Sequence, residues 1–276
     1  MKIKKVGIIG VGFMGASLAL AVKKRFPHIS IWGYARSKKS FNKLKKLNIL
    51  DRVSRSLEEV IRGCDLVVLA APILAIVDYI KEINDFLKEG AVIIDLGSTK
   101  SMIDRKAKKN LSKKVSFVGC HPLCGSEMQG AENANKDLYK NAICIVTSRN
   151  KAAEFIKKFW QELGCQVYYL NPFLHDKILS YISHLPHIIS FSLTWLVSKK
   201  YFKFVSSSFK DSTRVSSSSS QIWADIFLSN RSNLLKNIKE YIKILKSFES
   251  FIKDKNKTKL LEIIKKVNLK QNTFHQ

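Results

Sequence analysis

Two hydrophobic patterns alternate along residues 1–171. Short apolar runs rich in β-branched residues are typical of strands buried on both faces, and between them apolar residues recur every three to four positions, as in amphipathic helices. The runs that predict strands lie at 5–9, 29–34, 66–70, 92–96, 116–118, 143–147 and 166–170. This alternation predicts a doubly wound α/β domain with a parallel sheet.

The pattern changes at Asn171-Pro172. Beyond this point strand patterns cease, and helical periodicity predicts helices at 178–197, 219–228, 231–252 and 257–267. We therefore expect two domains, with the sheet in residues 1–171 and only helices in residues 172–276.

A glycine-rich turn joins the first strand to the first helix. Gly10, Gly12 and Gly15, with Phe13 and Met14 between the last two, form the pattern G-x-G-x-x-G. Glycines in this pattern permit a tight turn and let the backbone approach a pyrophosphate, and the free N–H groups of the helix N-terminus bind that anion. Because the pattern follows an apolar strand and opens a helix, it predicts a Rossmann-type dinucleotide site rather than a turn that merely packs.

The residues after the second strand indicate which dinucleotide is bound. An NAD site usually has an acidic residue there for the ribose hydroxyls, but this chain has Ala35 followed by Arg36 and Ser37. A carboxylate would repel a 2′-phosphate, whereas a guanidinium and a hydroxyl would hold one. The sequence thus favours NADP over NAD, and the alternative is that Arg36 only stacks on the adenine ring.

Composition limits the partners and the compartment. With 48 Lys and Arg against 22 Asp and Glu the formal charge is +26, but the lysines are spread over the whole chain. We expect a basic surface that attracts anionic substrates, with no nucleic-acid partner. No apolar run approaches the length of a membrane span, and no signal peptide precedes the first strand. Five cysteines give no disulfide framework, so we expect a cytoplasmic protein that does not bind membranes.

Two loops at strand ends carry candidate catalytic residues. Ser98 follows the fourth predicted strand and His121 the fifth. Ligands of open α/β sheets bind outside the carboxyl ends of the strands, which places both residues on the ligand side. Ser98 could instead cap the next helix, and His121 could be a structural loop histidine. Cys120 and Cys124 flank His121, but without a second ligand pair no metal site is expected.

The helical part carries a second polar cluster. His184 and His187 flank Pro186 inside an otherwise apolar segment, which is an awkward choice for stability alone. Arg214 ends the segment KDSTR, and its guanidinium is suited to grip a carboxylate with two hydrogen bonds. The alternative for Arg214 is a surface ion pair.

Taken in order, five motifs resemble the prephenate dehydrogenase family of tyrosine biosynthesis over almost the whole chain. They are G-x-G-x-x-G, DLGSTK (95–100), GCHPLCGSE (119–127), SHLPH (183–187) and KDSTR (210–214). The resemblance implies a nucleotide-binding domain, a helical dimerisation domain that forms a homodimer, and an active site between them. It also implies the oxidative decarboxylation of prephenate to 4-hydroxyphenylpyruvate with hydride transfer to NAD(P), without a metal.

Residue roles follow from the resemblance. His121 matches the histidine that accepts the proton of the ring hydroxyl, and Ser98 matches the serine that orients this hydroxyl. Arg214 matches the arginine that binds a substrate carboxylate. The residues that resemble further pocket positions are His184, His187, Ser126, Glu127 and Trp223.

The sequence departs from the family in two places and leaves two rival functions open. Relatives often have glycines where this chain has Ser206–Ser208, and the acidic residue after the second strand is missing. The runner-up is an arogenate dehydrogenase, or a cyclohexadienyl dehydrogenase that accepts both substrates, since arogenate has an amino group in place of the side-chain keto group. A non-catalytic NADP-binding regulator is a more remote alternative. We expect a monofunctional enzyme.

Overall fold

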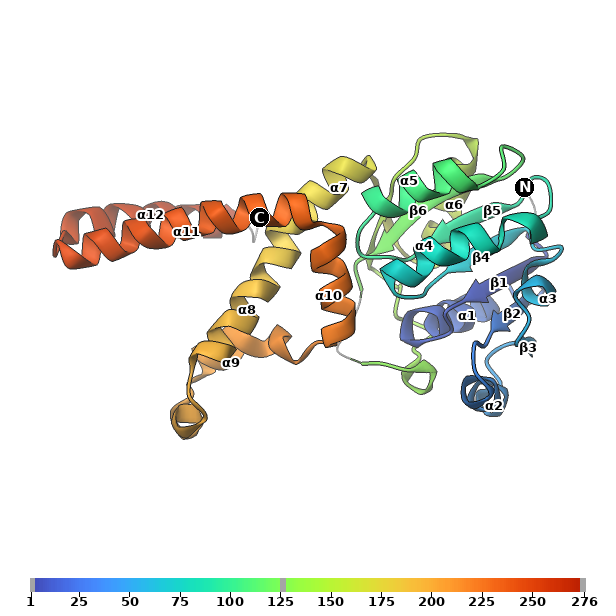
Figure 1. The fold of residues 1–276 in the computed structure, drawn as a ribbon, viewed down its shortest axis with the longest axis horizontal. Coiled ribbons are helices and arrows are strands. Elements are labelled where there is room, and N and C mark those ends of the chain that lie inside the picture. Colours follow the sequence, from blue (N-terminus) through green and yellow to red (C-terminus); the bar gives the residue numbers. More distant parts are fainter. Residues whose placement is uncertain (1–2, 125–127, 274–276) are drawn as a thin grey trace. The chain divides into compact units, whose positions relative to one another are not determined.

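The computed structural model describes residues 3–124 and 128–273. Within these residues eight strands form one sheet in the order β3-β2-β1-β4-β5-β6-β7-β8 (Figure 1). The strands are β1 (Lys5–Ile9), β2 (Ser30–Tyr34), β3 (Arg52–Ser54), β4 (Leu66–Leu69), β5 (Val92–Asp95), β6 (Ser116–Pro122), β7 (Ile143–Val146) and β8 (Gln166–Tyr169). Neighbours are parallel except β6 and β7. The predicted doubly wound α/β sheet is confirmed, with one antiparallel pair.

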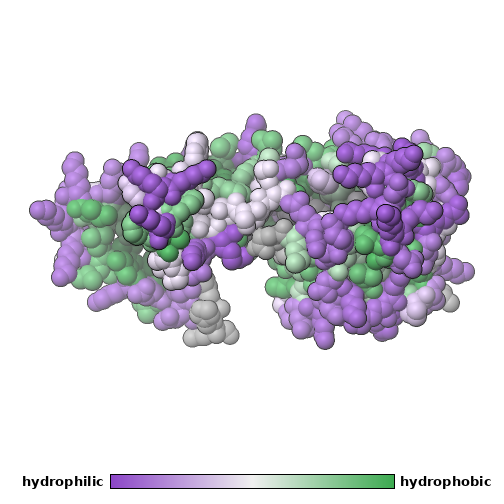
Figure 2. Space-filling model, turned by 90° about the horizontal axis from the view of Figure 1, so that it is seen from below, coloured by the Kyte–Doolittle hydropathy of each residue, from purple (hydrophilic) through white to green (hydrophobic). Residues whose placement is uncertain are grey.

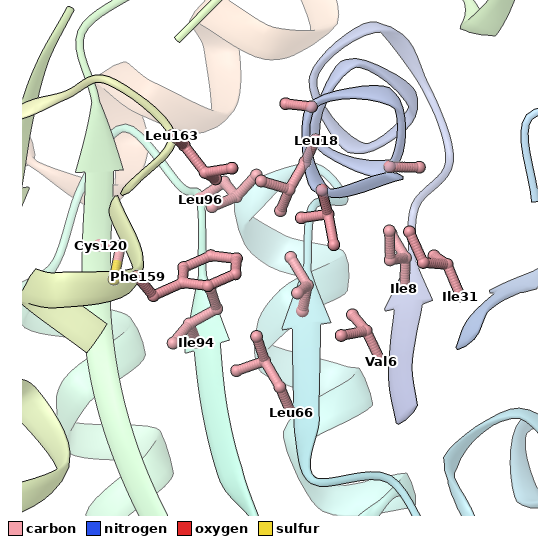
Figure 3. Packing of buried hydrophobic residues seen from close by; sticks show 14 of the residues in the cluster. Val6, Ile8, Leu18, Ile31, Leu66, Ile94, Leu96, Cys120, Phe159 and Leu163 are labelled. Carbon is pink, nitrogen blue, oxygen red and sulfur yellow. The ribbon is translucent and has the colours of Figure 1, made fainter. Parts of the chain in front are cut away.

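Helices cover both faces of this sheet. They are α1 (Phe13–Arg25), α2 (Lys38–Leu47), α3 (Leu57–Ile61), α4 (Ile73–Glu82), α5 (Ser101–Asn110) and α6 (Lys151–Glu162), and a 3-10 turn (Asn84–Phe86) follows α4. Residues of α1, α2 and α6 pack on one face of the sheet, and residues of α3, α4 and α5 pack on the other. Figure 3 shows the first face, where Val6, Ile8 and Ile94 lie on the same side as Leu18 of α1 and Phe159 of α6.

This two-sided cover explains the apolar runs. Successive strand residues point to opposite faces of a sheet, and here both faces are dry. Every residue of β4 and of β5 is buried, so the sequences LVVL and VIID show no polar alternation.

The remaining residues are helical, as predicted. They form α7 (Pro172–Leu179), a π-helix (Ser180–His184), α8 (Leu185–Leu196), a 3-10 turn (Lys199–Phe204), α9 (Ser207–Thr213), a second 3-10 turn (Arg214–Ser217), α10 (Ser220–Ser229), α11 (Arg231–Lys253) and α12 (Lys257–Asn272). Contacts divide the chain into two compact units, residues 1–230 and residues 231–276. In the second unit α11 and α12 lie side by side (Figure 1). No described helix is both long and apolar enough to cross a bilayer.

The first helix of this part begins earlier than the periodicity predicts. The side chain of Asn171 accepts a hydrogen bond from the N–H of Leu174, and Pro172 occupies the first turn. An Asn cap followed by Pro is a strong start signal, since Pro has no N–H to leave unpaired. The predicted continuous helix at 178–197 is also interrupted by the π-helix. This wider turn lies immediately ahead of Pro186, whose ring would clash with a carbonyl of a regular helix.

The structure corrects the expected surroundings of two candidate residues. His121 was expected in a loop, but β6 continues to Pro122, and His121 pairs with Ile145 of the antiparallel strand β7. The short apolar run at 116–118 did not reveal this extension because the partner strand follows later in the chain. Ser98 does not cap the next helix, since Lys100 is the N-cap residue of α5.

Candidate functional site

The glycine turn between β1 and α1 has the shape that a dinucleotide site requires. Gly10 has φ of +89°, and a Cβ there would lie 2.6 Å from the backbone of Ala70. A Cβ on Gly15 would lie 2.4 Å from the carbonyl oxygen of Gly10, so a larger residue fits at neither position. In contrast, a Cβ on Gly12 would meet nothing within 4 Å. Gly12 is the N-cap of α1 and provides no side-chain cap, which leaves space for an anion at the N–H groups of the first turn.

Phe13 and Met14 contribute to this turn through the backbone. Phe13 is buried, and the carbonyl oxygen of Met14 accepts a hydrogen bond of 2.7 Å from the Tyr139 hydroxyl. Ser17 one turn later accepts one of 3.0 Å from the N–H of Asn135. The segment before β7 therefore braces the first turn of α1.

The residues after β2 are placed at the start of α2. Arg36 and Ser37 are exposed, and Ala35 is buried. The Ser37 hydroxyl caps α2 by accepting a hydrogen bond from the N–H of Ser40. Burial raises the pKa of Tyr79 on α4, and the charge of Arg36 opposes this, so Arg36 lies near that ring.

A chain of three buried side chains starts at His121, at the carboxyl end of β6. His121 Nδ1 is 2.8 Å from His175 Nε2, and His175 Nδ1 is 2.8 Å from Asp176 Oδ1. The carboxylate of Asp176 also accepts hydrogen bonds from the backbone N–H groups of Lys100, at 2.7 Å, and Ser101, at 2.8 Å. We call His121, His175 and Asp176 the relay.

The direction of each hydrogen bond in the relay follows from its acidic end. Burial alone would raise the pKa of Asp176, but hydrogen bonds from His175 and from the start of α5 lower it, so the group is an ionised acceptor. His175 must then donate from Nδ1, which leaves a lone pair on the Nε2 of a neutral ring. His121 donates to this lone pair from Nδ1. The relay therefore leaves the Nε2 atom of a neutral His121 as a base.

The surroundings keep His121 neutral. Burial lowers its pKa well below the usual value, and His175, Lys100 and His184 add to this effect. The pKa of His175 is also lowered by burial, although Asp176 opposes this. A buried neutral imidazole with one free nitrogen is suited to accept a proton from a substrate.

A second group of side chains comes from the π-helix, α8 and α10. Asn230 donates from Nδ2 to the carbonyl oxygen of Asp176 at 2.7 Å, and the same nitrogen lies 3.1 Å from His184 Nδ1. His184 Nδ1 is therefore an acceptor, and its ring proton is on Nε2. Burial lowers the pKa of His184 to about 4, so this ring is neutral too. The ring of His187 stacks on Trp223, with centroids 3.5 Å apart.

Arg214 begins the 3-10 turn that follows α9 and is exposed. Burial lowers the pKa of His187, and the nearby charge of Arg214 lowers it further. The structure thus brings Arg214 near His187. We refer to His121, His175, His184 and His187 as the four histidines of the site.

Among the residues that the structure describes, the remaining predicted ones are not hydrogen-bonded to the four histidines. Ser98 is half-buried on the loop between β5 and α5, and in the described part of the chain its hydroxyl is not hydrogen-bonded to His121. Ser126 and Glu127 lie outside the described residues. Ser206, where relatives often have glycine, caps α9 by accepting a hydrogen bond from the N–H of Phe209. Residues 3–124 and 128–273 contain no group of three His, Cys, Asp or Glu side chains that could hold a metal ion.

Sequence analysis missed several residues that complete the site. His175 contacts the predicted His121 and is itself bonded to Asp176, and Asn230 contacts the predicted His184. Lys100 and Asp95 form a buried ion pair, and the Lys100 ammonium is bonded to the residue before His121. One signal was available for His175 and Asp176. They stand side by side between the apolar pairs Phe173-Leu174 and Ile178-Leu179, directly after the Asn-Pro start of a helix, and a His-Asp pair is unusual at buried helix positions.

Comparison with known proteins assigns both parts of the chain. Residues 18–169 match the family model for the prephenate dehydrogenase nucleotide-binding domain, and residues 171–266 match the one for its dimerization domain. The cyclohexadienyl dehydrogenase of Zymomonas mobilis is 31% identical over 95% of this chain and 93% of its own length. The prephenate dehydrogenase of Lactococcus lactis is 34% identical over 88% of this chain and 69% of its own. Prephenate dehydrogenase from Aquifex aeolicus, solved with hydroxyphenyl propionate and NAD+, superposes with a TM-score of 0.89 at 31% identity, covering 98% of each chain.

Proposed function

Since this chain belongs to the prephenate dehydrogenase family, we propose that it converts prephenate, with a nicotinamide cofactor, to 4-hydroxyphenylpyruvate and carbon dioxide. The observation that carries this proposal for the present residues is the relay, which leaves the Nε2 atom of a neutral His121 as a base. The same compact unit contains the open glycine turn that a dinucleotide requires.

The proposed chemistry assigns one task to each group. The bound nicotinamide supplies the hydride acceptor. The Nε2 atom of His121 takes the proton of the ring hydroxyl as a hydride leaves the ring carbon that bears this hydroxyl. The carbon–carbon bond to the ring carboxylate then breaks, carbon dioxide leaves, and the bonding electrons complete the aromatic ring. The ring oxygen is left as a phenolate and takes up one proton from solvent to give 4-hydroxyphenylpyruvate, which balances the proton that His121 later releases.

Other side chains hold charge and orientation during this reaction. Ionised Asp176 is connected to His121 through two hydrogen bonds, one between Asp176 and His175 and one between His175 and His121. Through this connection its negative charge stabilises the imidazolium that forms when His121 gains the proton. Ser98 orients the substrate hydroxyl, and Arg214 binds a substrate carboxylate. We assign His184, His187 and Trp223 to the substrate pocket. For Ser126 and Glu127, which lie outside the described residues, the same assignment is based on the motif GCHPLCGSE alone.

We propose NADP as the preferred cofactor. Two observations support this. The position after β2 holds Ala35 rather than an acid, and Arg36 and Ser37 are exposed at the N-terminus of α2, where backbone N–H groups and a guanidinium favour a phosphate.

We also propose a homodimer formed through the helical domain, residues 172–276, with residues 1–171 as the dinucleotide-binding domain. The matched dimerization-domain model and the exposed apolar side chains support this. In residues 231–276 these include Ile252, Leu269 and Val267, and apolar patches among hydrophilic ones are visible at the left end of Figure 2, where α11 and α12 lie. A monomer mass from light scattering at micromolar protein would contradict the dimer.

One set of assays tests the reaction and the cofactor. Purified protein is assayed with prephenate and with arogenate, each with NADP and NAD, and His121→Asn is assayed beside it. We expect the highest kcat/KM with prephenate and NADP, and a loss of about 10²- to 10⁴-fold in kcat for His121→Asn with little change in cofactor affinity, because a positioned general base contributes about that much. Comparable turnover of both substrates would make the chain a cyclohexadienyl dehydrogenase, and cofactor binding without turnover would make it a regulator.

A further inference from the structure

A buried lysine, Lys100, lies next to the relay, and the proposed reaction assigns it no role. The side chain of Lys100 is 1% exposed, and its ammonium forms an ion pair with Asp95, which is fully buried. The same ammonium donates a hydrogen bond of 2.7 Å to the carbonyl oxygen of Cys120, the residue before His121. Lys100 also donates its backbone N–H to Asp176 Oδ1. Lys100 is thus bonded to Cys120, which precedes His121 at one end of the relay, and to Asp176 at the other end.

Stability alone is a poor reason for such a pair. Taking two charges out of water costs much of what their attraction returns, and neutral side chains of similar size often replace a buried ion pair without loss. Burial raises the pKa of Asp95, which is the sign of that cost, and Lys100 opposes the rise. The position of the pair next to the relay offers a reason that stability does not.

Four elements besides its own strand bring titratable groups near His121. They are Asp95 at the end of β5, Lys100 at the start of α5, His175 and Asp176 on α7, and His184 on the π-helix. Among them Lys100, His175 and His184 add to the lowering of the His121 pKa by burial. Asp95 and Lys100 cancel at long range, but the ammonium is the end that is bonded to the chain next to His121. A positive charge so placed, with little water between, opposes a second proton on the imidazole.

On the basis of the proposed function, we propose that Lys100 is a positioning residue. It holds both ends of the relay in register, and its charge keeps His121 unprotonated, so that the base stays active in mildly acidic conditions. Lys100 and Asp176 act in opposite directions. Asp176 stabilises the proton that His121 takes from the substrate, and Lys100 favours the return of this proton to solvent before the next turnover.

The test replaces the charge and measures His121 directly. We compare Lys100→Met, which keeps the length and removes the charge, with the double variant Asp95→Asn/Lys100→Met, which leaves no unpaired carboxylate. Lys109→Met, an exposed lysine on the same helix α5, is the matched control. In each full-length protein without ligands, NMR follows the His121 ring C–H signal with pH, and the signal is assigned by its loss in His121→Asn. The pH profile of kcat/KM is measured in parallel.

We expect the pKa of His121 to rise by at least about half a pH unit, a threefold change in proton affinity, in both Lys100 variants, with the acidic limb of kcat/KM moving the same way. Lys109→Met should leave both unchanged. An unmoved His121 signal in the folded double variant overturns the proposal, and so does a double variant that fails to fold, since the pair would then serve the fold. If His121→Asn keeps the acidic limb, the proposed function loses its base, yet the NMR titration still decides the role of Lys100.

Discussion

Replacing Asp176 by Asn tests the relay at its acidic end. The carboxylate accepts three hydrogen bonds, one from His175 Nδ1 and two from the backbone N–H groups that start α5. An amide has one oxygen and one donor nitrogen. In the parent protein Oδ1 accepts from both His175 Nδ1 and the Lys100 N–H, and Oδ2 accepts from the Ser101 N–H. If the amide nitrogen takes the place of Oδ1, it faces His175 and donates to its Nδ1, and the Lys100 N–H loses its acceptor. His175 then carries its proton on Nε2, His121 must accept on Nδ1, and the proton of His121 moves to Nε2.

This change of tautomer removes the base without removing the histidine. In a Ser-His-Asp triad the same Asp-to-Asn change keeps the geometry and lowers kcat by about 10⁴-fold for this reason. The relay here has one more histidine between the acid and the base, so we expect a loss in kcat of about 10²- to 10⁴-fold. If the amide turns the other way, His175 keeps its acceptor and the Ser101 N–H loses its own. Either orientation leaves one backbone N–H at the start of α5 without an acceptor, which destabilises the protein by about 1–3 kcal/mol.

The assay is steady-state turnover of prephenate with the preferred cofactor, together with a thermal melt. Asp104→Asn is the control, because Asp104 lies in the first turn of the same helix but pairs with exposed Lys108. We expect kcat to fall for Asp176→Asn, the cofactor KM to stay within about threefold, and the control to behave as the parent. A folded Asp176→Asn protein that keeps kcat within threefold of the parent would refute the tautomer argument.

Three further expectations concern the cofactor, the substrate and pH. Arg36→Gln should lower kcat/KM with NADP about tenfold or more and leave NAD turnover nearly unchanged, since it removes a charge-assisted hydrogen bond; Arg105→Gln on α5 is the control, and an equal loss with both cofactors would count against the assignment. Arg214→Ala should raise the KM for prephenate strongly with a smaller effect on kcat, because a carboxylate held alike in ground and transition states is uniform binding; an unchanged KM would contradict this. Burial lowers the pKa of all four histidines of the site. An unfolded histidine has a pKa near 6.5, so below about pH 6.5 the unfolded chain binds more protons than the folded one. The free energy of unfolding should therefore fall with acid by about 1.4 kcal/mol per pH unit for each histidine that stays neutral in the folded protein. Denaturant melts that show equal stability at pH 7 and pH 5.5 would exclude this.

Local patterns in the sequence determined most of the sheet and most helices. Apolar runs predicted β1, β2, β4, β5, β7 and β8 to within about a residue, whereas the three-residue edge strand β3 was not predicted. In β1, β4, β5 and β7 the run is continuous because nearly every residue is buried and no polar alternation is left. The glycine turn could be predicted because local backbone geometry requires two of its glycines: Gly10 has a positive φ, and Gly15 packs too closely on the carbonyl oxygen of Gly10 to carry a Cβ. Motif order over the whole chain was enough to indicate the family, which the comparisons confirm.

The tertiary structure alone decided what surrounds the base. His121 lies in a strand because Ile145 of β7 pairs with it, and no local pattern in the sequence indicates that partner. The contacts of His121 with His175, of Asp176 with Lys100, and of Asn230 with His184 join residues 54, 76 and 46 positions apart. Which groups meet, and how much water is excluded around them, sets the tautomers, the charge states and the burial of the Lys100–Asp95 pair. A single sequence specifies neither the contacts nor the exclusion of water. The chemistry-bearing residue types are therefore visible in the sequence, whereas the protonation state that makes His121 a base arises only when α7 brings His175 against His121 of β6 and Asp176 against the start of α5.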